Sequence, residues 1–152
     1  MLYPILKWLH VLSAIVAVGS NATYGVWIAR ASGKPEALPF TLRGIKLIDD
    51  RLANPAYGML LITGLLMVYQ ARLLLTSPWL LTALILYGSL VLLGLLGYTP
   101  TLRRQIKLLE DQGSASPEYQ AMARRGTALG IVTAILAIAI VFLMVVKPPL
   151  WS

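Results

Sequence analysis

Apolar residues gather in four long runs, which polar and basic segments separate from one another. The runs cover residues 5–29, 53–71, 79–98 and 128–146. A helix needs about 20 consecutive apolar residues to cross the hydrocarbon core of a bilayer, so each run is long enough for a transmembrane helix. The pattern therefore predicts an all-α fold, a four-helix transmembrane bundle that forms a single domain over residues 1–152.

Within the first run, polar and small residues recur at spacings of three and four, which places them on one face of a helix. This stripe comprises His10, Ser13, Ala14, Ala17, Ser20, Asn21 and Tyr24. Lipid cannot satisfy polar groups, so we expect the stripe to face other helices. The first span should therefore be the helix around which the others pack.

The segment after the first run predicts a break and then a short amphipathic helix. Gly33 and Pro35 are helix breakers. In residues 39–52, PFTLRGIKLIDDRL, apolar residues recur near helical spacing and charged residues take the other side. We expect this helix to lie at the membrane surface. Asn54 and Pro55 should then start the second span, with proline in its first turn.

The remaining polar segments predict a tight connection, a helical extension and a helix start. Residues 72–78 are short, so the second and third spans should be adjacent and antiparallel. Residues 101–112, TLRRQIKLLEDQ, should continue the third span as a helix into water. Ser116, Pro117 and Glu118 have the order of a helix start: a cap, a first-turn proline and an acid.

Lysine and arginine are unevenly distributed between the two ends of the predicted bundle. Segments 30–52 and 99–127 carry five each, whereas the opposite end carries three in total, Lys7, Arg72 and Lys147. The positive-inside rule places the two richer segments in the cytoplasm and both chain termini outside. We expect a multi-pass protein of the cytoplasmic (inner) membrane of a bacterium.

Composition supports a membrane protein and narrows the classes of function. The chain is 58% hydrophobic and 12% charged, whereas soluble domains are about 45–50% apolar and about 25% charged. The net charge of +7 suits cytoplasmic loops beside anionic lipid, and we expect no nucleic-acid partner. The absence of cysteine excludes disulfides, thiolate metal sites and cysteine nucleophiles. The first run lacks a basic segment before it and a cleavage site after it, so it should not be a signal peptide.

His10 is the only histidine and lies about one turn inside the first span. An intramembrane histidine can ligate heme iron or relay protons, or it can be structural and bond to a carbonyl or to Ser13. One chain cannot build a bis-histidine heme site, so heme would need a dimer, an open position, or a methionine such as Met59 or Met67. Lys7 shares a helix face with His10 and either snorkels to headgroups or holds a propionate or phosphate.

Small and hydroxyl residues indicate where the helices contact one another. Polar groups deep in a span favour hydrogen bonds between helices, and small residues at four-residue spacing let helices approach closely. The residues predicted to mediate packing are Ser13, Ser20, Asn21, Thr63, Gly126, Gly130 and Ala134. The same signals fit contacts within one chain, a homo-oligomer or a larger membrane complex.

Two adjacent carboxylates, Asp49 and Asp50, precede the second span. Such a pair can bind a cation, but it more often forms ion pairs with neighbours, here Arg43, Lys46 or Arg51. Adjacent residues of a helix point about 100° apart, so the two carboxylates would not face one catalytic site. We expect ion pairing at this position and no catalytic role.

Five short stretches, in this order and spacing, resemble the bacterial DUF2269 family of small integral membrane proteins. They are KWLHVLSAI (7–15), DRLANP (50–55), TGLLM (63–67), RRG (124–126) and MVVKP (144–148). The resemblance covers nearly the whole chain and implies a four-span membrane fold. It implies no particular activity.

The WLHV stretch also resembles the first helix of the HemJ and CopD-like membrane proteins. The first group is a heme-associated protoporphyrinogen oxidase group, and the second is linked to copper. This resemblance implies His10 as an axial heme ligand, with Lys7 as its neighbour and heme b as the cofactor. It is an analogy at the level of fold and does not itself establish a site.

Three functions fit the sequence. The first is a non-enzymatic membrane protein that acts through helix contacts or as an accessory subunit of a membrane complex. The second is a heme-binding redox or porphyrin protein with His10 as axial ligand. The third is a small oligomeric transporter, which is the weakest because only the first span has a sustained polar stripe.

Overall fold

The computed structural model describes residues 1–150, which are almost entirely helical and contain no strand. The elements in chain order are α1 (Leu2–Ser32), the 3-10 turn η1 (Pro35–Ala37), α2 (Leu38–Ile48), the π-helical η2 (Asp49–Ala53), α3 (Asn54–Gln70), α4 (Pro78–Leu92), the π-helical η3 (Leu93–Tyr98), α5 (Thr99–Gln112) and α6 (Pro117–Val146). Consecutive elements join into four continuous helices that are long and apolar enough to cross a membrane: Leu2–Ser32, Pro35–Gln70, Pro78–Gln112 and Pro117–Val146. The predicted all-α fold with four membrane helices is confirmed.

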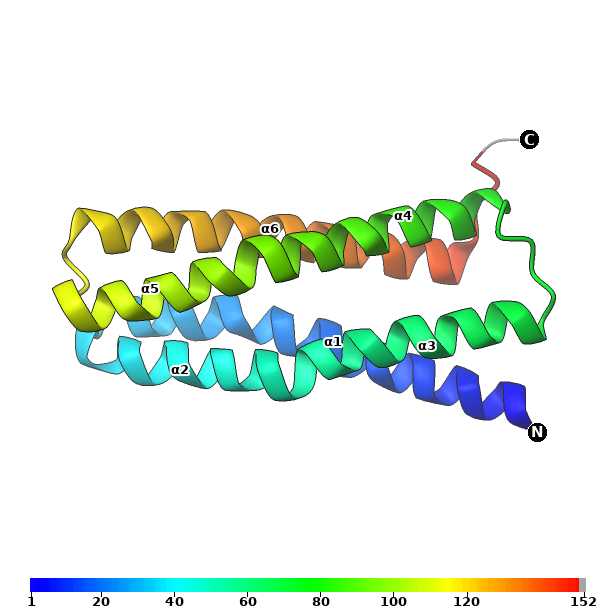
Figure 1. Cartoon of the computed structure of the whole chain (residues 1–152), viewed down its shortest axis with the longest axis horizontal. Helices are drawn as coiled ribbons and strands as arrows, with labels where there is room; N and C mark the ends of the chain where they lie inside the picture. The colour runs from blue at the N-terminus through cyan, green and yellow to red at the C-terminus, as the bar shows by residue number, and fades with distance from the viewer. Residues whose placement is uncertain (151–152) are drawn as a thin grey trace.

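The helices are arranged as two pairs, as Figure 1 shows. α1 packs along α3, and α4 packs along α6, whereas α3 and α4 make almost no contact with each other. α2 and α5 continue α3 and α4 toward the end of the molecule that lies opposite the two termini (Figure 1). The pairs are joined at that end, where α2 contacts α5, and by a smaller contact between α1 and α6.

The predicted amphipathic helix is confirmed as α2, and its apolar face is covered by protein. Leu38, Leu42 and Ile45 of α2 are buried in one cluster with Leu102 and Leu109 of α5. α2 stays in line with α3, so its apolar stripe meets the stripe of α5, which continues α4 in the same way. This cluster is the main apolar core of the described residues and holds the two helix pairs together.

Two π-helical turns interrupt the long helices directly before prolines. η2 ends one residue before Asn54–Pro55, and η3 ends at Tyr98, two residues before Pro100. Proline lacks an N–H and its ring crowds the carbonyl four residues earlier, so a widened turn accommodates both defects without breaking the helix. α3 begins at Asn54 with Pro55 in its first turn, as predicted, but this is not a separate helix start, because the helix runs on from α2 through η2 into α3.

The helix ends follow the local signals in the sequence. α1 ends at Ser32 with Gly33 as its C-cap, and α6 begins at Pro117 with the Ser116 hydroxyl accepting from the Tyr119 N–H at 3.2 Å. Helix α6 ends where Lys147 adopts a left-handed conformation, and its ammonium lies 5.2 Å from the centre of the Trp79 ring. That cation–π contact ties the end of α6 to the start of α4.

The polar stripe of α1 faces the rest of the protein, as predicted. Ala17 is fully buried, and Tyr24 is 4% exposed. His10 and Asn21 both form hydrogen bonds with α3. Lipid cannot form hydrogen bonds with these polar groups, so they are bonded within the bundle. This explains why α1 and α3 form the most extensive helix contact.

Candidate functional site

A large cavity of about 960 Å³ lies between the two helix pairs, where α3 and α4 fail to meet. Its lining comes from α1, η2, α3, α4, η3, α5 and α6 and is mostly apolar. The polar members of the lining are Asn21, Tyr24, Ser32, Asp49, Asn54, Tyr57, Tyr87, Tyr98, Thr99, Thr127 and Thr133. Small-molecule sites in proteins are commonly about 300–1,000 Å³, apolar, with a few placed polar groups, and this cavity has those properties.

Glycine creates much of the space. Gly25, Gly58, Gly88 and Gly94 line the cavity from α1, α3, α4 and η3. A Cβ atom added to any of these four would have no atom within 4 Å, so each faces open space. The cavity is therefore wide at several points along its length, and larger side chains at these positions would fill it without a clash at Cβ.

Tyr57 of α3 organises the polar wall of the cavity. Asn21 donates from Nδ2 to the Tyr57 hydroxyl at 2.7 Å, which links α1 to α3. The Tyr87 hydroxyl donates to the Tyr57 carbonyl at 2.5 Å, which links α4 to α3 across the otherwise open space. Because Tyr57 takes part in both bonds, its position is fixed from both helix pairs.

Tyr24 of α1 lines the cavity, and its hydroxyl has no hydrogen-bond partner within residues 1–150. The side chain is 4% exposed, so the hydroxyl is removed from bulk water. Among the described residues it is the one buried side-chain polar atom without a partner. A buried polar group left unpaired costs free energy of about 1–3 kcal/mol, so a ligand that bonds to it gains that much.

Asp49 lies in the π-helical turn η2 and is 6% exposed. Its carboxylate accepts one hydrogen bond, from the Asn54 amide at 3.4 Å. Burial raises the pKa of Asp49, and the neighbouring Asp50 carboxylate raises it further. The bond from Asn54 and the charge of Lys46 oppose this effect in part. The result is a buried acid whose charged form is poorly compensated.

Asp50 differs from Asp49 in its exposure and in its partner. It is exposed and forms an ion pair with Lys46 one turn earlier. Arg43, also predicted to pair here, instead donates from Nε to Glu110 of α5 at 2.9 Å. The expected ion pairing therefore holds for Asp50, whereas Asp49 is directed into the cavity.

His10 lies half-buried against α3 and bonds to Thr63, not to Ser13. The Thr63 hydroxyl donates to the Met59 carbonyl at 2.6 Å, so His10 Nδ1 is the donor in the 3.0 Å bond between His10 and Thr63. The imidazole also packs on Gly64, where an added Cβ would lie 3.1 Å from Cε1. These contacts give His10 a structural role between α1 and α3.

Heme ligation by His10, with Lys7 as its neighbour, stays a prediction. The Nδ1 bond leaves Nε2 with a free lone pair, which suits a metal ligand. His10 lines neither this cavity nor the smaller one that is described below, and Lys7 is exposed. Over residues 1–150, no group of three His, Cys, Asp or Glu side chains could hold a metal ion. His10 thus offers one candidate ligand atom.

The other predicted packing residues lie in several parts of the bundle. Asn21 and Thr63 bond across the α1–α3 contact, and Gly126 lies against α5, where an added Cβ would be 3.3 Å from Gln105 Oε1. Gly130 and Ala134 line the cavity. Ser13 and Ser20 are half-buried on the α1 stripe. Whether these residues also bring separate chains together stays a prediction.

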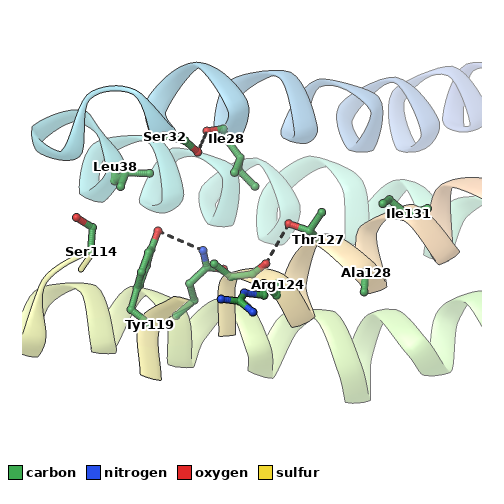
Figure 2. Close-up of a pocket in the computed structure, with 11 residues that line it drawn as sticks. Ile28, Ser32, Leu38, Ser114, Tyr119, Arg124, Thr127, Ala128 and Ile131 are labelled. Carbon is green, nitrogen blue, oxygen red and sulfur yellow. Dashed lines mark hydrogen bonds between the residues drawn. The ribbon is translucent and has the colours of Figure 1, made fainter. Parts of the chain in front are cut away.

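A second, smaller cavity of about 540 Å³ adjoins the first toward α2 and α5. The two share lining residues, among them Ser32 and Thr127. Figure 2 shows Tyr119 and Arg124 of α6 on one side of this cavity, with Leu38 and Ser32 across from them. The Tyr119 hydroxyl accepts from Gln105 at 3.5 Å. This space lies toward the end of the bundle that carries the basic segments.

The cavity-lining tyrosines of α3, α4 and η3, which are Tyr57, Tyr87 and Tyr98, were not predicted from the sequence. A usable signal exists. Tyrosine prefers the membrane interface, where its hydroxyl meets polar groups. A tyrosine in the interior of a span, such as Tyr57 or Tyr87, therefore needs a hydrogen-bond partner within the protein. Both residues have such partners in the structure, and both line the same space.

Comparison with known proteins identifies the family. A search of curated proteins and a search of solved structures each returned no match. The family model described as a predicted integral membrane protein, DUF2269, matches residues 4–148. That range includes both cavities and all of the helices except the first two residues of α1. The chain therefore belongs to the DUF2269 family of predicted integral membrane proteins.

Proposed function

We propose that this protein is a non-enzymatic, membrane-embedded binding protein that holds an amphiphilic small molecule between its two helix pairs. The observation that carries the proposal is the cavity of about 960 Å³, with an unpartnered, buried Tyr24 hydroxyl in its wall. Its lining offers hydroxyls, amides and one carboxylate, which suit recognition of a ligand. A ligand bound there would fill space that lipid chains or water otherwise occupy.

The bilayer is the source of such a ligand in this proposal. Several lining residues, including Leu61, Leu92 and Ile131, are also exposed on the surface of the bundle. The cavity thus communicates with the apolar surface that faces lipid. An amphiphile partitioned into the membrane could enter laterally between α3 and α4, where contacts are fewest.

The proposed setting is the cytoplasmic membrane of a bacterium, with both termini outside. Segments 30–52 and 99–127, which carry five Lys or Arg each, lie at the same end of the bundle, opposite the termini (Figure 1). This common location supports the orientation that the positive-inside rule predicts. A reporter fused to the C-terminus should read as exterior, and a cytoplasmic reading would overturn the orientation.

Mass spectrometry of the gently purified protein tests the binding function. The wild-type protein should carry a co-purified small molecule close to one per chain. Gly58→Leu and Gly88→Leu place side chains in the open part of the cavity and should remove that molecule. Gly19→Leu is the matched control, because Gly19 also faces open space but lies outside the cavity lining.

Four outcomes would reject the proposal or favour an alternative. A wild-type protein without any bound molecule, or equal loss in the Gly19→Leu control, would contradict binding in this cavity. A Soret absorption band that His10→Ala removes would favour the heme hypothesis. Stable co-purification of other membrane proteins, with the cavity empty, would favour an accessory subunit.

A further inference from the structure

The main cavity contains one charged side chain among the described residues, and that side chain is the carboxylate of Asp49. The chain as a whole carries a net charge of +7, so a lone negative group in this position is not a general feature of its composition. Lys46 forms its ion pair with Asp50, and within the described residues 1–150 the only hydrogen bond to the Asp49 side chain is the long one from Asn54. A buried carboxylate without an ion-pair contact is costly, and a cationic ligand would offset that cost.

The unpartnered Tyr24 hydroxyl is a second, independent observation at the same end of the cavity. Asp49 is close enough for its charge to act on the hydroxyls of Tyr24, Tyr57 and Tyr98. A hydroxyl oxygen can accept a hydrogen bond from an ammonium group, and tyrosine rings attract cations over their faces. Acceptors and aromatic faces thus converge from α1, η2, α3 and η3.

We propose that the ligand of the main cavity is an amphiphilic amine, whose ammonium donates to the Asp49 carboxylate and the Tyr24 hydroxyl. This inference rests on the proposed binding function and specifies the class of ligand. The apolar body of the amine lies along the leucines and glycines of α3 and α4. Since no Lys or Arg among residues 1–150 lines the main cavity, a phosphate would have no cationic partner in it, which favours a small amine over an aminophospholipid.

Binding of three decyl compounds to the protein in phosphatidylglycerol nanodiscs tests this inference. Decylamine, decanol and decanoate have the same chain length and differ in charge, and their affinities follow from shifts of the thermal unfolding midpoint. Decylamine should bind about tenfold more tightly than decanol or decanoate. Asp49→Asn should abolish this preference, and Tyr24→Phe should reduce it.

The matched control is Asp50→Asn, which removes the adjacent carboxylate but leaves the cavity intact. It should keep the preference for decylamine. Equal affinity of the wild-type protein for all three compounds would overturn the inference while leaving the binding function standing. Binding of none of them would contradict both. Displacement of decylamine when phosphatidylethanolamine is added to the nanodiscs would show a lipid occupant and reject the small amine.

Discussion

At the scale of single residues, the bond between His10 and Thr63 is the clearest contribution to the α1–α3 contact. We expect His10→Ala and Thr63→Val each to lower the free energy of unfolding by about 1–3 kcal/mol, because each removes the bond between the helices and Thr63→Val also leaves His10 Nδ1 without its partner. The two effects should not add, and their coupling should be about 0.6–1.7 kcal/mol, as for hydrogen bonds between membrane helices. Unfolding in mixed SDS micelles of both single variants and the double variant measures this. Fully additive effects would show that the two side chains do not interact.

Gly64 is required for a different reason, since the imidazole of His10 occupies the space where its side chain would be. Gly64→Ala should destabilise the protein by about 1–3 kcal/mol, because a Cβ atom 3.1 Å from His10 Cε1 forces the ring to move. Gly58→Ala on the same helix meets no atom within 4 Å and should be neutral or slightly stabilising. The same unfolding assay compares them, and equal effects would argue against close packing at Gly64.

Asp49 should make the stability of the empty protein depend on pH. Its pKa is raised in the folded state, so the folded protein binds a proton more readily than the unfolded chain does. Stability should therefore be greatest below the ordinary carboxyl pKa and fall as pH rises through the raised pKa of the folded state. The ionisable groups around Asp49 on the elements packed against it are Tyr24, Lys46, Asp50, Tyr57 and Tyr98. Asp49→Asn should flatten this part of the profile, and a wild-type profile parallel to that of the variant would contradict the assignment.

At the scale of secondary-structure elements, the apolar faces of α2 and α5 hold the two helix pairs together. Leu42 of α2 is fully buried in that contact, whereas Leu47 is exposed. Leu42→Ala should lower the free energy of unfolding by about 2–5 kcal/mol, as for other buried leucines, and Leu47→Ala should have little effect. Circular dichroism during denaturation measures both. Similar, small effects of both substitutions would place α2 on the membrane surface instead of against α5.

Element boundaries were predicted well where local chemistry decides them and poorly where long-range packing does. Ser116 and Pro117 have the chemistry of a helix start, and α6 begins there. Asn54 and Pro55 have the same order of a cap residue and a first-turn proline, yet the helix continues through Pro55. The difference lies in the preceding residues: α2 is anchored against α5, so continuing the helix through a π-helical turn disrupts less packing than breaking it.

At the scale of the whole molecule, hydropathy alone was enough to predict four spans because lipid allows few alternatives. The stripe on α1 predicted which face is buried. The cavity could not be predicted, because it results from the failure of α3 and α4 to pack, which is a relation between helices. Asp49 and Tyr24 were both noticed in the sequence, but only the fold brings them to one space.

Protection of a single thiol by a bound ligand tests the central claim, that the space between the helix pairs is a ligand site. The chain contains no cysteine, so Gly88→Cys would introduce one reactive group into the cavity, and Gly19→Cys would introduce one outside it. Saturating decylamine or decanol should slow maleimide labelling of the thiol at position 88 and leave labelling at position 19 unchanged. Equal labelling rates at position 88 with and without either compound would contradict the claim.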